Sequence, residues 1–232
     1  MNIVNWDKVF KESDNFKTRS PTKWVFFEEF LNRDFYEKLR KSYPKFDNGW
    51  ELEDSYDKLS YRKYWKMGDE KILLPVDDER YSESWNEFMR YARSKECCEK
   101  LYNFTGVPIT NLKHFGFMII KKNGFQLPHI HNASDKTLIV FLYFSNDWKE
   151  GDPGATYLSK DLDLDEKNII FEPYTLDNTA LIVLDGPNAA HGARKISKDV
   201  ERKAIQLTYE PYSITDGWYG SARKDIPELL DL

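Results

Sequence analysis

The sequence is poor in the residues that build disulfide frameworks and membrane spans. Its 232 residues contain two cysteines, Cys97 and Cys98, and these are adjacent. Neighbouring cysteines rarely bridge each other because the geometry is strained, so a disulfide framework is excluded and a reducing, cytoplasmic environment fits best. No window approaches the 18 apolar residues of a spanning helix, and the first residues lack the pattern of a signal peptide. We therefore expect a cytoplasmic protein without a membrane partner.

Positive charge is also limited. The 34 basic residues are outnumbered by 39 acidic ones, which gives a formal net charge of −5. Because no basic run interleaved with aromatic residues occurs, nucleic-acid binding is not expected. In contrast, 41% of the residues are hydrophobic and 16% are aromatic, which is enough to bury a sizeable core. A chain of this length and composition favours a single domain over residues 1–232.

The sequence changes character once along its length. The first part, 1–105, is dominated by helical and irregular patterns and is expected to support the second part. Within it, the Asp-, Lys- and Tyr-rich stretch 46–80 is expected to form a loop or an irregular lid. Strand patterns dominate the second part, 106–212, and a tail follows at 213–232.

Helix signals are clear at several points of the first part. Asn32 is a suitable N-cap for a helix that places Phe35, Leu39 and Tyr43 on one face and is stopped by Pro44. The other expected elements are a strand at 24–27, a helix from Ser82 or Ser84, and a helix that ends at Gly106 with Cys98, Leu101 and Tyr102 facing inward.

The second part reads as a series of short strands separated by Gly, Pro, Asn and Asp turns, which indicates a sandwich or barrel. Residues 137–144 are apolar on both faces, so this strand should be buried on both sides. The helices of the first part would then cover one sheet. The remaining expected strands are 115–120, 180–184 and 202–209, with a hairpin turn at Asn123-Gly124.

Three of the four histidines suggest a metal site. His129 and His131 lie two residues apart, so on a strand their side chains point the same way. His191 closes a short loop after the strand at 180–184, and a barrel would bring it alongside the first two. Converging imidazoles suit Fe(II), Zn or Cu. The fourth histidine, His114, has no partner in the sequence and is expected to be structural or on the surface.

Arg202 follows His191 by eleven residues and begins an alternating strand. Alternation places Arg202, Ala204, Gln206 and Thr208 on one face, which is polar as expected of a wet cavity. A buried arginine in such a cavity needs a counter-anion, and a dicarboxylic cosubstrate would supply one through a forked contact.

The order of these pieces resembles the prolyl-hydroxylase-like superfamily of Fe(II)- and 2-oxoglutarate-dependent oxygenases. The resemblance covers residues 112–212 and implies a double-stranded β-helix, or jelly roll, with helices packed on one sheet. The pieces that carry it are Leu127-Pro-His-Ile-His, the strand ending at Phe141-Leu-Tyr-Phe-Ser-Asn-Asp-Trp148, Gly154-Ala-Thr-Tyr-Leu, His191 and Arg202-Lys-Ala-Ile.

The resemblance also implies an enzyme that uses Fe(II), 2-oxoglutarate and O2 to hydroxylate its substrate, with release of succinate and CO2. In that scheme His129 and His191 would be iron ligands. Arg202 would bind the distal carboxylate of 2-oxoglutarate, and Tyr143 would hydrogen-bond the same group. The expected partner is a small-molecule or peptide substrate, and a homodimer is open.

One position departs from the family pattern, because His131 stands where the carboxylate ligand is expected. His131 itself ligates in the first account, which gives a three-histidine site. In the second, the register shifts so that Ala133 takes the carboxylate position, as in the superfamily's halogenases, where a small residue leaves room for chloride. Asp135 supplies the carboxylate in the third. The Leu127-Pro lead-in favours the first register.

A different class of function is a jelly-roll binding protein without turnover. Retention of Arg202 together with three histidines argues against this alternative. It predicts no iron uptake and no response to 2-oxoglutarate.

Overall fold

The computed structural model describes residues 2–68, 73–131, 136–149 and 152–211. Eleven strands within these ranges form one curved antiparallel sheet in the order β1-β9-β6-β11-β4-β3-β5-β10-β7-β8, with β2 paired to β3. The strands are β1 (Trp24–Glu28), β2 (Glu51–Ser55), β3 (Lys58–Tyr64), β4 (Asn111–Ile120), β5 (Phe125–His129), β6 (Leu138–Ser145), β7 (Thr156–Ser159), β8 (Ile169–Phe171), β9 (Leu176–Leu184), β10 (His191–Ala193) and β11 (Arg202–Glu210).

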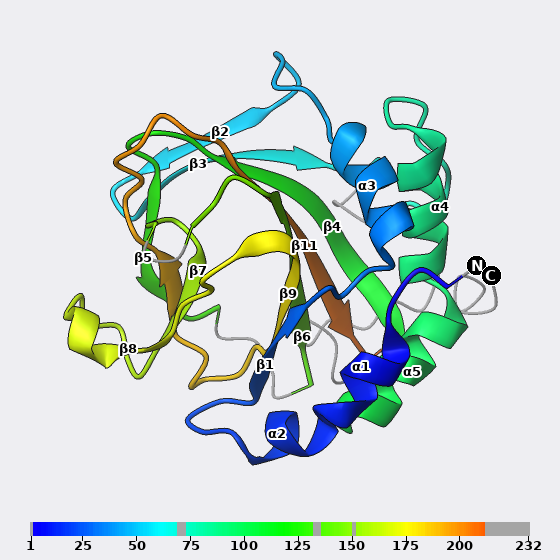
Figure 1. Cartoon of the computed structure of the whole chain (residues 1–232), viewed down its shortest axis with the longest axis horizontal. Coiled ribbons are helices and arrows are strands. Elements are labelled where there is room, and N and C mark those ends of the chain that lie inside the picture. Colours follow the sequence, from blue (N-terminus) through cyan, green and yellow to red (C-terminus); the bar gives the residue numbers. More distant parts are fainter. Residues whose placement is uncertain (1, 69–72, 132–135, 150–151, 212–232) are drawn as a thin grey trace.

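The sheet curls into a barrel with two walls (Figure 1). We call β1, β9, β6, β11 and β4 the major sheet, and β5, β10, β7 and β8 the minor sheet; β3 pairs with both β4 and β5 and so joins them. Side chains link the two ends: the ring of Trp24 on β1 lies 4.5 Å from that of Phe171 on β8, and the hydroxyl of Tyr174, just after β8, donates a hydrogen bond to Glu28 on β1. This arrangement is the expected double-stranded β-helix.

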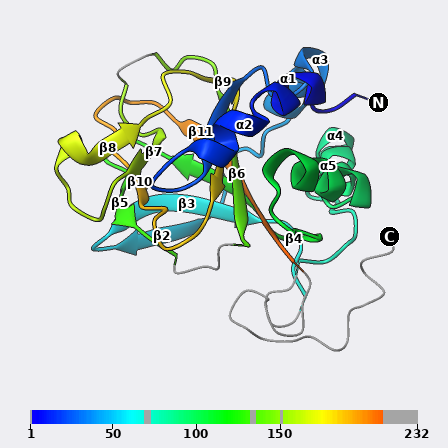
Figure 2. The same cartoon turned by 90° about the horizontal axis from the view of Figure 1, so that it is seen from below.

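Helices cover the outer face of the major sheet, as Figure 2 shows from a second direction. Asn32 caps α3 by accepting a hydrogen bond from the backbone N–H of Asp34, and Ser82 caps α4 in the same way. Gly106 ends α5 in the left-handed region with φ of 75°, a conformation that favours glycine. The helices are α1 (Trp6–Lys11), α2 (Ser13–Thr18), α3 (Arg33–Lys41), α4 (Glu83–Ala92) and α5 (Lys95–Thr105).

Two apolar cores explain why β6 is hydrophobic on both faces. Val140 and Leu142 face outward and pack in the cluster that includes the helices. Phe141 and Tyr143, on the opposite face, belong to the cluster inside the barrel. The prediction that this strand is buried on both sides is confirmed, because all eight of its residues are buried.

The strand β11 also has the two faces expected of it. Ile205 and Leu207 pack outward with the helices, whereas Ala204 lies in the inner cluster. Arg202 and Gln206 share the inward parity of Ala204 and are buried. The polar face of β11 therefore lines the inside of the barrel.

The prediction for 46–80 is wrong in its central part. Residues 51–64 form the hairpin β2–β3, which extends the sheet beyond β4. The sequence of this hairpin does not alternate between apolar and polar residues, because the face that carries Glu53 and Arg62 is held by ion pairs rather than by apolar packing.

Two smaller predictions also need correction. Asn123 and Gly124 form a turn, but β4 and β5 on either side of it follow one another along the same edge of β3, so the turn is an interruption and not a hairpin. In α5, Tyr102 is 48% exposed, and Cys97 takes the inward position instead.

No described helix is both long and apolar enough to cross a bilayer. Residues 213–232, expected as a tail, lie outside the described ranges, as do Ala133 and Asp135.

Candidate metal centre

Strand pairing brings two of the histidines together. His129 is the last residue of β5 and His191 the first of β10, and they are direct partners in the antiparallel ladder. Their ring centroids lie 4.4 Å apart. Residues separated by 62 positions in sequence thus become neighbours through the register of the minor sheet.

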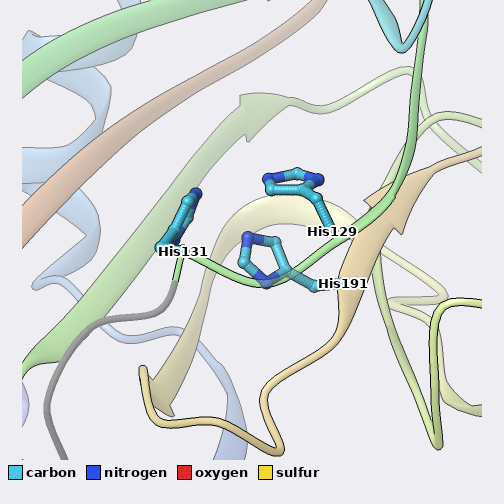
Figure 3. Close-up of side chains that lie close together, drawn as sticks. All are labelled: His129, His131 and His191. Atoms are coloured by element: carbon cyan, nitrogen blue, oxygen red, sulfur yellow. The ribbon is translucent and has the colours of Figure 1, made fainter.

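His131 completes the cluster from the segment after β5. Its ring centroid lies 4.9 Å from that of His129 and 4.8 Å from that of His191. One ligand atom from each of the three side chains lies within 4.8 Å of the others, and the rings point toward one another (Figure 3). The sequence prediction that these three residues converge is confirmed, and the group is placed to hold a metal ion.

The hydrogen bonds of the rings determine which nitrogen is free. His129 Nδ1 lies 2.9 Å from the carbonyl oxygen of Leu127, and His191 Nδ1 lies 2.8 Å from that of Ala189. His131 Nδ1 lies 3.0 Å from a carboxylate oxygen of Asp185. Carbonyl and carboxylate oxygens only accept hydrogen bonds, so each Nδ1 must carry the proton. A ring in its uncharged form then keeps a lone pair on Nε2.

Burial favours the uncharged form of His129 and His191. Desolvation lowers the pKa of His129, and it lowers the pKa of His191 well below its ordinary value, with the neighbouring histidines adding to the effect. His131 is the most accessible of the three, with 27% of its side chain exposed. A cluster of imidazoles with one partly exposed member suits a transition metal that keeps an exchangeable position.

Arg202 lies inside the barrel, and no carboxylate of the described residues forms an ion pair with it. It is fully buried, and it donates one hydrogen bond of 2.6 Å, from Nη2 to the hydroxyl of Thr156 on β7. Its Nε and Nη1 atoms have no hydrogen-bond partner among the described residues. Burial lowers the pKa of the Arg202 guanidinium, since a charge in this environment is costly.

Tyr143 lies beside this guanidinium. The Arg202 carbon Cζ is 5.0 Å from the centre of the Tyr143 ring, and the buried Tyr143 hydroxyl also has no hydrogen-bond partner in the described structure. Two open donors of the Arg202 guanidinium and the adjacent Tyr143 hydroxyl could together bind an anion with several acceptor oxygens, and we call this group the cradle.

The register of β10 gives the spacing between the histidines and this cradle. His191 pairs with Leu158, and Ala193 pairs with Thr156, the hydrogen-bond partner of Arg202. Two residues along a strand correspond to about 7 Å and to the same face of the sheet. Thr156, which holds the Arg202 guanidinium, therefore lies one side-chain step along the sheet from His191, a step comparable to the length of a short dicarboxylate.

Two residues of the site were not assigned by the sequence. Thr156 belongs to the segment Gly154-Ala-Thr-Tyr-Leu, but nothing in the sequence pattern indicated a role for its hydroxyl. Asp185 could be recognised only as the residue that follows an apolar strand.

The fourth histidine, His114, lies on the inner face of β4, half-buried against the ring of Tyr64, and burial lowers its pKa to about 4. The expectation of a surface position is thus wrong, while a structural role agrees with its packing.

Comparison by sequence finds nothing, since no family model and no curated protein matches this chain. Comparison of structures does find similar proteins. A prolyl-4-hydroxylase from Pseudomonas putida superposes with a TM-score of 0.64 at 11% identity, covering 88% of this chain and 100% of that one.

Two further structures extend the likeness. A prolyl hydroxylase from Trichoplax adhaerens, in complex with a hypoxia-inducible-factor peptide, gives a TM-score of 0.57 at 12% identity, covering 88% of each chain. HygX from Streptomyces hygroscopicus, with nickel and 2-oxoglutarate bound, gives 0.59 at 14% identity, covering 89% of this chain and 88% of that one; it has also been solved with hygromycin B. This chain therefore has the double-stranded β-helix fold of the prolyl hydroxylases and related 2-oxoglutarate oxygenases.

Proposed function

We propose that this protein is an Fe(II)- and 2-oxoglutarate-dependent dioxygenase. The observation that carries the proposal is the unpaired, buried guanidinium of Arg202, one side-chain step behind three free imidazole nitrogens. A buried cation with open donors is costly unless a ligand anion pairs with it. A metal site alone would not explain it, whereas a cosubstrate that reaches from the metal to the arginine does.

In this proposal His129, His131 and His191 hold the iron through Nε2, and their Nδ1–H groups are fixed by hydrogen bonds. Arg202 and Tyr143 bind the distal carboxylate of 2-oxoglutarate, and Thr156 orients the guanidinium. Bound iron with 2-oxoglutarate and O2 would supply oxidative decarboxylation to succinate and CO2, coupled to hydroxylation of a substrate C–H bond.

The ligand set is neutral, in contrast to a site with two histidines and one carboxylate. A metal held by three neutral imidazoles keeps its full positive charge, which favours Fe(II) over Fe(III). Asp135, the alternative carboxylate ligand, lies outside the described residues. The proposal uses His131 because its ring already meets the other two.

We propose a small molecule or a peptide as the substrate. Support comes from the similar structures, which were solved with a peptide fragment in one case and with hygromycin B in another. The open side of the site is the side of His131. Halogenation would need an empty position for the halide, and the imidazole of His131 already lies beside the other two ligands, so we do not extend the proposal to it.

The test is anaerobic addition of Fe(II) and 2-oxoglutarate, followed by exposure to air. We expect a weak visible charge-transfer band and then formation of succinate. The band should be absent in His191→Ala and weakened in Arg202→Met. His114→Ala and Arg194→Met are matched controls, since His114 is outside the cluster and Arg194 is paired with Glu172. Absence of both the band and succinate with the unaltered protein would refute the proposal and favour a binding protein.

A further inference from the structure

The three histidines differ in what holds them. His129 and His191 donate to backbone carbonyls, whereas His131 donates to the carboxylate of Asp185. The Asp185 side chain is 1% exposed, and its second oxygen, Oδ1, has no hydrogen-bond partner among the described residues. Burying a carboxylate costs free energy unless hydrogen bonds or a cation compensate for it. The placement of Asp185, whose side chain contacts His131 within the described residues, therefore needs an explanation.

Asp185 is held on a rigid part of the fold. It directly follows β9, and its backbone N–H donates to the carbonyl oxygen of Thr137, 2.8 Å away. The adjacent pair Leu184 and Leu138 joins β9 to β6 in the major sheet. His131, in contrast, follows the end of β5 and belongs to no strand. The carboxylate therefore anchors a ring whose own backbone is less constrained.

We infer that Asp185 is a positioning residue of the metal centre, which acts through His131 and places a negative charge behind a ligand set that, as proposed above, has three histidines. The hydrogen bond fixes the proton on Nδ1, turns Nε2 toward the other two ligands, and places a negative charge next to a single imidazole. A carboxylate behind a metal-bound histidine raises the basicity of that ligand. The negative charge of Asp185 would thereby balance part of the positive charge of a metal held by three neutral imidazoles.

This inference rests on the metal centre of the proposed function and is tested with Co(II) as the probe. Asp185→Asn keeps the size of the side chain and an acceptor oxygen but removes the charge. Asp185→Ala removes the contact. Outer-shell partners of metal ligands typically contribute 10- to 100-fold to affinity. We expect Co(II) to bind about 10-fold more weakly to Asp185→Asn and up to about 100-fold more weakly to Asp185→Ala, with a changed visible spectrum.

A double-mutant cycle separates positioning from a general structural role. In the His131→Ala background, Asp185→Asn should change the Co(II) affinity less than about twofold, because residues that act as a unit are not additive. Asp78→Asn is the matched control: Asp78 is also buried, but it pairs with Arg80 away from the histidines. That control should lower the melting temperature and leave Co(II) binding unchanged.

The outcomes are distinct. If the unaltered, folded protein does not bind Co(II), both the metal centre and this inference fail. If it binds Co(II) but Asp185→Asn binds equally well, or loses the same factor with and without His131, the inference alone fails and the proposed function stands. Circular dichroism and thermal melting of each variant establish that the compared proteins are folded.

Discussion

At the scale of single residues, Arg202 carries a charge inside the barrel that no carboxylate within the described ranges balances. Its contacts within the described structure are the hydroxyl of Thr156 and the ring of Tyr143, and neither is an anion. A buried charge of this kind costs stability in the ligand-free protein. This loss of stability can be measured on the ligand-free protein without an activity assay.

We predict that Arg202→Met stabilises the ligand-free protein, because methionine fills the volume without a buried charge. The gain should be about 1 kcal/mol or more, which corresponds to a melting temperature higher by about 2–4 °C. Thermal melting without ligands measures it. In the same variant, 2-oxoglutarate should raise the melting temperature of the metal-loaded protein by less than it does in the parent. A clear loss of stability would show instead that Arg202 is a structural residue.

The sequence predicts some of these residues and misses others for a physical reason. His129 and His131 are visible because the two-residue repeat of a strand puts them on one side, and the same repeat marks the inner face of Arg202. The roles of Thr156 and Asp185 depend on contacts across 46 and 54 residues of chain. No local pattern encodes such pairings, so they emerge only when the sheet is assembled.

At the scale of elements, one hydroxyl ties the helical layer to the sheet. Tyr43, which follows α3, lies 2.7 Å from the carbonyl oxygen of Ala204 and 2.9 Å from that of Met118. These two residues are partners across β11 and β4. The contact holds the end of α3 against β4 and β11, and β11 is the strand that begins with Arg202.

Tyr43→Phe should therefore lower the free energy of unfolding by about 1–3 kcal/mol, because it removes the buried hydroxyl donor that these two carbonyl groups share. Denaturant unfolding measures this loss. Tyr56→Phe is the control, since Tyr56 is 91% exposed and its change should stay within about 0.5 kcal/mol. Equal effects of the two changes would rule out the proposed tie between α3 and the sheet.

The hairpin β2–β3 is stabilised by charge rather than by apolar burial. Glu53 accepts hydrogen bonds from Lys58, Ser60 and Arg62, and Arg62 also donates to Gln206 on β11. Burial alone would raise the pKa of Glu53, but the charge of Arg62 and these hydrogen bonds outweigh it and lower the pKa to about 2. Such a segment has no hydrophobic alternation, which is why its strands could not be predicted.

Because the pKa of Glu53 is lower in the folded than in the unfolded protein, the free energy of unfolding should decrease as the pH falls. The contribution of Glu53 should be fully present above the unfolded-state pKa, about 4.3, and should disappear as the pH falls toward about 2. It amounts to at most about 3 kcal/mol. Unfolding curves between pH 6 and pH 2 should show Glu53→Gln less stable than the parent at pH 6 and equal to it near pH 2. Glu99→Gln, at an exposed site on α5, should follow the parent throughout.

At the scale of the whole molecule, the site joins the two walls of the barrel. The metal-binding group is attached to the minor sheet through β5 and β10, whereas Arg202 and Tyr143 belong to β11 and β6 of the major sheet. The fold class could be predicted because the order of strands and motifs is a property of the chain. The relative depth of the two halves of the site could not, since it depends on the register of β10.

Because one cosubstrate would bridge both walls, we predict that metal and 2-oxoglutarate stabilise the protein cooperatively. At concentrations 100-fold above its dissociation constant, a ligand adds about 2.7 kcal/mol, or about 5–10 °C in melting temperature. Co(II) alone should give a shift of this kind, 2-oxoglutarate alone little, and both together more than the sum. Glutarate, which lacks the keto group that chelates the metal, should not reproduce the additional shift. If 2-oxoglutarate stabilised the metal-free protein equally, it would have to bind away from the histidines, and the bridge between the sheets would not exist.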